Sequence, residues 1–264
     1  MQSNPQEELT NRYNREASAY RDLWAPVLRL AGLKLLRELA GGRAERIIDV
    51  GTGVGSMSPH LQMTFPGAFV LGVDRSPGML ALGPAGIPRA VMDATQLGIA
   101  HASADRVLLV CMLFHLERPV DGLREGRRVL RNGGRLGTVT WAEELQSSAS
   151  RIWTECLDAH GAAEGDSTIE ARHELVNTPE KMEKLLRLAG FTSARCWQDE
   201  LVTSIDLDRL IRLKTSLGAA KRRFDNLAAG AREACVAAAR RQMEALEPEG
   251  FIARGRVVYA VATV

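Results

Sequence analysis

One stretch of the chain decides the fold: Ile47-Ile48-Asp49-Val50-Gly51-Thr52-Gly53-Val54-Gly55. A short apolar strand ends here in an acidic residue, and three glycines at alternate positions follow. Glycine accepts dihedral angles that other residues avoid, and its missing side chain lets a ligand approach the backbone closely. A helix predicted over residues 56–65 then offers the unpaired N–H groups of its first turn to a polar ligand. The stretch therefore predicts a strand, a ligand-binding loop and a helix.

The next predicted strand supplies a carboxylate that fits a ribose-containing ligand. This strand covers residues 68–73 and is followed by Asp74, which lies 19 residues after Gly55. A carboxylate about 20 residues beyond such a loop is suited to bind ribose hydroxyls. Dinucleotides and S-adenosylmethionine (SAM) both carry a ribose, so the glycine spacing must separate them. A dinucleotide loop has the pattern G-x-G-x-x-G, whereas here Ser56 occupies the third glycine position.

The pattern D-x-G-x-G-x-G from Asp49 to Gly55 resembles motif I of class I SAM-dependent methyltransferases. The resemblance is strongest over residues 46–137 and is closest to the small-molecule branch, which includes ubiquinone/menaquinone-biosynthesis-type and natural-product enzymes. That branch often has D-x-x-x-L after its third strand, and Asp93 to Leu97 matches it. Residues 129–136 are similar to its turn before strand five, with Asn132 in place of the usual proline.

Strands and helices alternate through the middle of the chain, which predicts an α/β fold with a parallel sheet. The resemblance implies a Rossmann-like seven-stranded sheet, mostly parallel with an antiparallel last strand, and helices on both faces. It also implies an N-terminal helical lid over residues 1–42 and a SAM-binding core over 43–142. A substrate-cap insertion after strand five would cover 143–178, and the C-terminal part of the same core 179–264.

Composition narrows the class of protein. The chain has 264 residues, of which 45% are hydrophobic and 25% charged, as in ordinary globular domains. A net charge of +2 gives no reason to expect nucleic acid as a partner. We expect no membrane span and no secretory signal in the first 12 residues. We also expect no metal site, because the Cys and His residues lack the spacing of metal ligands. Four widely spaced cysteines suit a reducing, cytoplasmic environment: Cys111, Cys156, Cys196 and Cys235.

The resemblance assigns cofactor roles to individual positions. Asp49 would hold the ammonium group of SAM, Asp74 the ribose hydroxyls, and Asp93 the adenine amino group. The alternatives are a loop-stabilising carboxylate at Asp49, a helix cap at Asp74 and a solvated loop residue at Asp93. The remaining expected cofactor contacts are Gly51, Gly53, Gly55, Arg75, Met79, Ala94, Cys111, Tyr13 and Tyr20.

The expected acceptor side has fewer sequence signals. His115 follows the fourth predicted strand and is a candidate general base, since its ordinary pKa lies near neutrality. It could equally be a histidine that bonds the loop backbone. Trp24, Trp141 and Trp153 are candidate substrate contacts. For the lid residues, including Trp24, an amphipathic helix that packs on the core explains the aromatic pattern as well.

The expected reaction is an in-line displacement that moves the methyl group from SAM to oxygen, carbon or nitrogen of a small molecule and releases S-adenosylhomocysteine (SAH). Alignment and exclusion of water would supply most of the acceleration. Other interpretations stay open: a SAM-binding or partner subunit without catalysis, non-methylating chemistry such as cyclisation, and an NAD(P)-dependent oxidoreductase. We expect a monomer or a homodimer.

Overall fold

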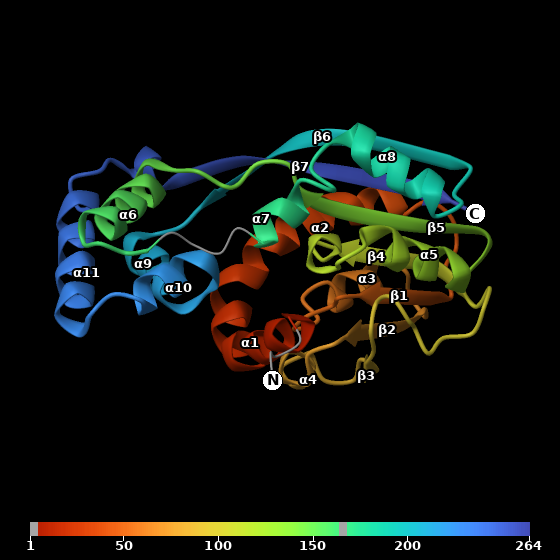
Figure 1. The fold of residues 1–264 in the computed structure, drawn as a ribbon. Coiled ribbons are helices and arrows are strands. Elements are labelled where there is room, and N and C mark those ends of the chain that lie inside the picture. Colours follow the sequence, from red (N-terminus) through yellow and green to blue (C-terminus); the bar gives the residue numbers. More distant parts are fainter. Residues whose placement is uncertain (1–4, 164–167) are drawn as a thin grey trace.

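A seven-stranded sheet organises the computed structural model, which describes residues 5–163 and 168–264 (Figure 1). The strand order is β3-β2-β1-β4-β5-β7-β6. Neighbouring strands from β3 to β5 are parallel, and β7 is antiparallel to both β5 and β6. The predicted α/β fold is therefore confirmed. The strands are β1 (Arg46–Val50), β2 (Phe69–Asp74), β3 (Arg89–Val91), β4 (Ala104–Val110), β5 (Leu130–Trp141), β6 (Ser193–Ser204) and β7 (Ile252–Thr263).

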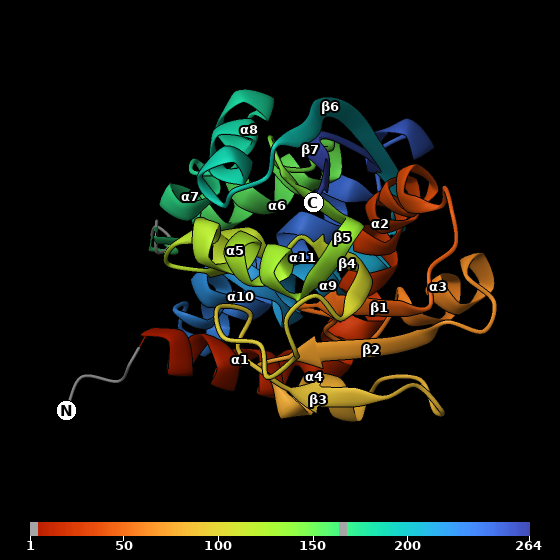
Figure 2. The same ribbon diagram turned by 90° about the vertical axis from the view of Figure 1, so that its right-hand side faces the viewer.

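Helices cover both faces of this sheet (Figures 1 and 2). Neighbouring residues of a strand point to opposite faces. On β5, Leu136 faces α5, while a Cβ atom at the adjacent Gly137 would lie 2.5 Å from Leu39 of α2. The helices around the sheet are α2 (Ala25–Leu39), α3 (Ser58–Thr64), α4 (Pro77–Ala81), α5 (Pro119–Val129) and α8 (Pro179–Leu188).

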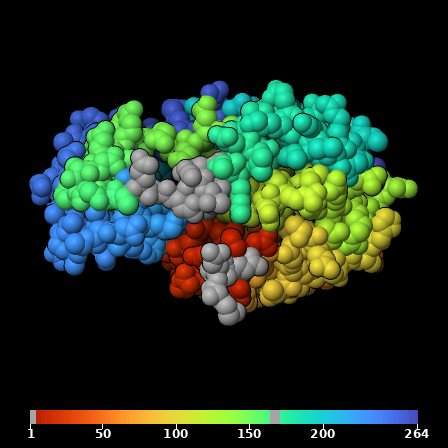
Figure 3. Space-filling model, in the orientation of Figure 1, coloured from red at the N-terminus to blue at the C-terminus, as the bar shows by residue number. Residues whose placement is uncertain are grey.

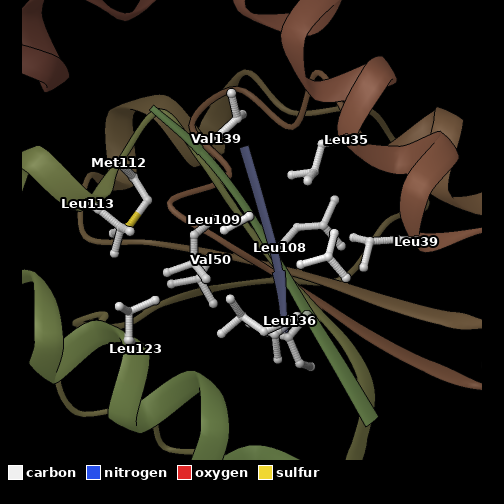
Figure 4. Packing of buried hydrophobic residues seen from close by; sticks show 14 of the residues in the cluster. Leu35, Leu39, Val50, Leu108, Leu109, Met112, Leu113, Leu123, Leu136 and Val139 are labelled. Carbon is white, nitrogen blue, oxygen red and sulfur yellow. The ribbon is translucent and has the colours of Figure 1, made fainter. Parts of the chain in front are cut away.

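The main hydrophobic core lies where the central strands meet these helices (Figure 4). Leu108 and Leu109 of β4 are fully buried although they point to opposite faces, as expected for a central strand covered on both sides. Leu35 and Leu39 pack on one face and Leu123 of α5 on the other. Burial of each such side chain contributes roughly 1.5–3 kcal/mol to stability.

A second hydrophobic cluster lies at the other end of the molecule, where green and blue elements form a helical lobe (Figures 1 and 3). Trp153, Cys235 and Met243 are completely buried in it. The lobe combines a helix from the expected 143–178 insertion with helices from the expected 179–264 segment. Its helices are α6 (Ser148–Ala159), α9 (Leu207–Ser216), α10 (Gly218–Asp225) and α11 (Ala229–Met243).

The N-terminal segment crosses the carboxyl-end edge of the sheet. Helix α1 (Pro5–Ala19) continues through a π-helical turn, η1 (Tyr20–Trp24), into α2, and α1 packs against α4 (Figure 2). Helix α7 (Thr168–His173) lies near the turn η2 (Leu113–His115) that follows β4. None of the described helices combines the length and the apolar character needed to cross a bilayer.

Candidate functional site

The three glycines after β1 all have left-handed backbone conformations. The φ angles are +70° at Gly51, +57° at Gly53 and +68° at Gly55. A Cβ atom would lie 2.8 Å from Met112 at the first position and 2.8 Å from Pro84 at the third. Both the conformation and the close approach require glycine at Gly51 and Gly55. The loop thus leaves its backbone uncovered by side chains of its own at the carboxyl end of β1.

Two carboxylates flank this loop at the ends of adjacent strands. Asp49 is 2% exposed and accepts a hydrogen bond of 2.7 Å from the Thr52 hydroxyl. Burial raises the pKa of Asp49 to about 6. Asp74 accepts hydrogen bonds from the N–H groups of Gly53 (2.8 Å) and Ser76 (2.9 Å), and burial raises its pKa as well. The structure brings both predicted carboxylates to the glycine loop.

A polar bridge lies beyond the ends of β2 and β3. The Arg75 guanidinium pairs with Asp93, and it also donates to the Gln6 amide oxygen of α1 at 2.8 Å. Asp93 accepts from the backbone and hydroxyl of Thr95 at 2.8 and 2.7 Å. Burial acts to raise the pKa of Asp93, but the bonds from Thr95 and Arg75 outweigh it and lower that pKa. Ala94 is nearly buried beside this bridge.

The fourth strand ends earlier than its apolar sequence predicts. A strand over residues 106–113 is expected, but β4 ends at Val110 because Cys111 adopts a left-handed conformation with φ +52°. The chain then turns through η2 and places His115 at the sheet edge. Burial raises the pKa of Cys111 to about 12, so its thiol stays protonated and is no nucleophile at neutral pH.

Helix α1, the expected lid, contacts His115 directly. The Tyr13 hydroxyl of α1 and Nε2 of His115 are 2.9 Å apart, and the two rings meet edge to face. Burial, and then the charges of Arg12, His173 and Arg172, lower the pKa of His115 to about 3. Its imidazole is therefore neutral at pH 7 and is only a weak base in this arrangement. Nδ1 of His115 is buried without a hydrogen-bond partner among the described residues.

Aromatic side chains close the same region. The rings of Tyr13 and Tyr20 meet edge to face with centroids 6.0 Å apart, and Trp24 stacks on Trp141 at 5.9 Å. A Cβ atom at Gly53 would lie 3.2 Å from Met79 and 3.6 Å from Tyr20, so both side chains lie over the loop. Trp153 is not brought to this site: it packs in the helical lobe against Phe224.

Two residues of the site carried no distinctive sequence signal. The Asn14 side chain accepts hydrogen bonds from the Ser76 hydroxyl at 2.7 Å and the Gly78 N–H at 2.9 Å, which docks α1 on α4. Asn disfavours helix interiors, so its place inside a predicted helix was the one available hint. Thr52 holds Asp49. Within residues 5–163 and 168–264, no three His, Cys, Asp or Glu side chains gather as a metal ion would require.

Comparison with known proteins agrees with this geometry. Residues 48–138 match a family model described as a methyltransferase domain. The chain is 33% identical over 142 residues to a malonyl-(acyl-carrier protein) O-methyltransferase of Hahella chejuensis, covering 52% of this chain and 51% of that protein. It is 30% identical over 156 residues to a demethylmenaquinone methyltransferase of Mycobacterium sp. (strain KMS), and this match covers 57% of this chain and 66% of that protein. The chain thus spans between half and two thirds of these curated relatives.

The fold has solved counterparts. A Haemonchus contortus phosphoethanolamine N-methyltransferase 2, solved with phosphomonomethylethanolamine and SAH, aligns with a TM-score of 0.51 at 18% identity. The alignment covers 88% of this chain and 51% of that one. This likeness concerns the fold alone. The sequence matches, and not this likeness, support the predicted class I SAM-dependent methyltransferase family: residues 48–138 of the chain match a methyltransferase domain.

Proposed function

We propose that this chain transfers a methyl group from SAM to a small-molecule acceptor and releases SAH. One observation carries the proposal: three left-handed glycines lie between two carboxylates, the buried Asp49 and the partly buried Asp74, at the ends of adjacent strands. Parallel sheets bind ligands at this edge. SAM carries an ammonium group and a ribose, and these carboxylates match both groups.

The proposed cofactor contacts follow from where each side chain lies around the glycine loop. Asp49 accepts from the ammonium group directly or through water, and Asp74 binds the ribose hydroxyls while it holds the loop through Gly53. The bridge of Arg75 and Asp93, with Ala94, flanks the adenine, and Met79 packs beside it. The backbone at Cys111 approaches the methionine part. The burial of Asp49 and the partial burial of Asp74 support these roles, because an acid shielded from water gains most from a cationic or hydroxyl partner.

The proposed acceptor side lies beneath the lid. Tyr13 and Tyr20 on one side, with Trp24 and Trp141 on the other, exclude water from the reacting atoms. Methyl transfer discharges the sulfonium, so a dry site that aligns nucleophile, methyl carbon and sulfur favours the reaction. His115 is neutral and in reach of an acceptor hydroxyl or amine. In the free protein it is better suited to orient the acceptor by a hydrogen bond than to take its proton.

The nature of the relatives supports a small acceptor. One curated relative is named for malonyl-(acyl-carrier protein) and another for demethylmenaquinone. We propose that the helical lobe caps the acceptor and that the enzyme acts in the cytoplasm as a monomer or homodimer. All four cysteines are free thiols, which fits a reducing compartment.

A methyl-transfer screen tests this proposal. The protein is incubated with SAM labelled at its methyl group and with phenols, quinone precursors, carboxylic acids or amines, and SAH formation is measured. We expect acceptor-dependent SAH and labelled product. SAM binding without transfer to any acceptor class would instead favour a non-catalytic SAM-binding protein. NADH binding in a fluorescence titration, with no SAM binding, would favour an oxidoreductase.

A further inference from the structure

Basic side chains from two separate elements surround His115. On the lid side, the guanidinium carbon of Arg12 lies 5.7 Å from the centroid of the Tyr13 ring, whose hydroxyl bonds His115. On the opposite side, the His173 ring lies against Phe114 with centroids 3.9 Å apart, and Arg172 precedes it on α7. Elements distant in sequence therefore bring two arginines and a histidine to one turn.

These arginines are not neutralised in the usual way. Most ion pairs of the described chain join an arginine to a nearby carboxylate, as Arg75 joins Asp93. No ion pair of Arg12 or Arg172 occurs among the described side chains. Glu16 and Asp74 are the carboxylates that act electrostatically near Tyr13, and burial raises the pKa of both. The field at His115 is consequently positive, which agrees with the lowered pKa of its imidazole.

We propose that Arg12 and Arg172 bind an oxyanion of the methyl acceptor beside His115, so that the acceptors of this enzyme are small organic anions with a carboxylate or phosphate group. The inference rests on the proposed function and specifies its substrate class. Guanidinium groups recognise both kinds of oxyanion through paired N–H donors. Among the described side chains Glu16 acts on Arg12, but no carboxylate forms an ion pair with either arginine, so a neutral acceptor would leave both half-buried cations poorly compensated.

Burial, together with the charges of the two arginines and His173, keeps His115 neutral in the free protein by lowering its pKa. An imidazolium here would repel both arginines, whereas the neutral ring can keep its bond to Tyr13 and leave the positive field to the anion. A bound oxyanion offsets that field and raises the pKa of His115. Anion binding should therefore be accompanied by proton uptake, measurable as a dependence of the binding enthalpy on the buffer.

The test uses the whole protein saturated with SAH and follows its melting temperature as probes are added. Benzoate and inorganic phosphate are the anionic probes, and benzamide is the neutral match for benzoate. We expect an affinity for benzoate roughly tenfold above that for benzamide. Arg12→Gln and Arg172→Gln should each weaken benzoate binding roughly fivefold or more, since each removes a charge-assisted contact. Benzamide and SAH binding should stay within about twofold for Arg172→Gln.

Arg15→Gln is the matched control, because Arg15 lies on α1 three residues from Arg12 but is exposed. It should leave benzoate binding unchanged. Arg172→Lys, which keeps the charge, should retain part of the affinity and serves if the glutamine variant folds poorly. Equal responses to benzoate and benzamide, or undiminished anion binding in the double glutamine variant, would overturn the inference. Failure of the wild type to bind SAH would instead contradict the proposed function.

Discussion

Two equally buried aspartates of the sheet differ in their partners. Asp105 accepts from the N–H groups of Glu45 and Arg46 and pairs with Arg131, whereas Asp49 has a single hydroxyl donor, Thr52. Both are 2% exposed. A buried carboxylate with so little compensation destabilises the folded chain. Asp49 therefore carries a cost that a cationic ligand would offset, which is typical of a binding residue rather than a structural one.

Asp49→Asn should raise stability while it weakens SAM binding. Because the folded pKa of about 6 exceeds the unfolded value of 3.8, the native state binds the extra proton, and wild-type stability falls as pH rises from about 4 to about 6. The amide has no charge to bury and can still accept from Thr52. We expect a gain of about 1–2 kcal/mol at pH 7.5, a flatter pH dependence and at least tenfold weaker SAM binding. Thermal unfolding at several pH values measures the stability and its pH dependence, and calorimetry measures the affinity for SAM.

Asp105→Asn is the control for burial alone. It should destabilise the protein by about 2–4 kcal/mol, because it removes the charge from three structural contacts. Its effect on SAM affinity in the folded protein should be small. Loss of stability in Asp49→Asn equal to that in Asp105→Asn would show that Asp49 is structural.

Gly51→Ala should damage the loop more than strain alone explains. A left-handed alanine costs about 1–2 kcal/mol, and here its Cβ would also collide with Met112 at 2.8 Å. Gly133 is the control, since its φ is +74° but nothing lies within 4 Å of an added Cβ. We expect Gly133→Ala to cost about 1 kcal/mol and Gly51→Ala about 2–4 kcal/mol, with loss of SAM affinity only in the latter. Equal costs in denaturant unfolding would contradict the collision.

The site residues that the sequence predicted are those whose positions follow from the spacing of a local motif. The glycines and Asp74 follow from spacing, and the structure places them together as expected. The left-handed Cys111 could not be predicted, because non-glycine residues rarely adopt that conformation. Nor could the contact of Tyr13 with His115, which are 102 residues apart in sequence. Trp153 was expected at the site because it is an aromatic residue in the expected substrate-cap segment. Its burial in the helical lobe depends instead on contacts with α10 and α11.

Among the elements, α1 is positioned by a close backbone approach to α4. A Cβ atom at Gly78 would lie 2.9 Å from Cα of Asn14, and backbone cannot yield as a flexible side chain can. Gly78 also donates its N–H to the Asn14 side chain. The missing Cβ of one glycine thus sets the distance between α1 and α4, and through α1 it sets the position of Tyr13 beside His115.

Gly78→Ala should lift the lid without unfolding the core. Alanine favours a helix more than glycine does, so the displaced partner is α1. We expect faster proteolysis within residues 5–24, a loss of methyl transfer of roughly tenfold or more and a change in global stability below about 1 kcal/mol. Gly98→Ala, whose Cβ would meet only Met92 at 3.9 Å, should behave as the wild type. An intact protease pattern in Gly78→Ala would contradict the role of this contact.

Element prediction succeeded where periodicity or burial was strong. The apolar run at residues 46–50 predicts a strand with the bounds of β1, and the pair Thr178-Pro179, a cap and a first helical residue, predicts the helix start seen in α8. Helix α10 was not predicted; none of its residues is fully buried, and it is held by partly buried side chains such as Phe224 that pack on the lobe cluster. Such a helix depends on tertiary contacts that a local pattern does not contain.

Across the whole molecule, the described residues form three hydrophobic clusters, of which the sheet cluster and the lobe cluster are the two large ones. The sheet cluster includes the strands that carry the glycine loop, while the lobe cluster surrounds Trp153. The strands β6 and β7 run between the two clusters, and we expect the lobe to open while the sheet stays folded. Its place beside the lid is the basis for the proposed cap.

Trp153→Ala should loosen the lobe selectively. Removal of a fully buried tryptophan costs about 3–5 kcal/mol locally. Hydrogen exchange should become faster in α6 and α11 but not in β4, and SAH affinity should change less than threefold. If β4 loses protection to the same extent, the two clusters form one cooperative unit instead.

The central claim, a SAM site between Asp49 and Asp74, is tested most directly by calorimetric titration of the wild type and Asp74→Ala with SAM and SAH. Asp74→Ala removes the proposed ribose contact and the acceptor of the Gly53 N–H. We predict binding of both ligands by the wild type and at least tenfold weaker binding by a folded Asp74→Ala variant. No binding by the wild type, or equal affinity in the variant, would contradict the account.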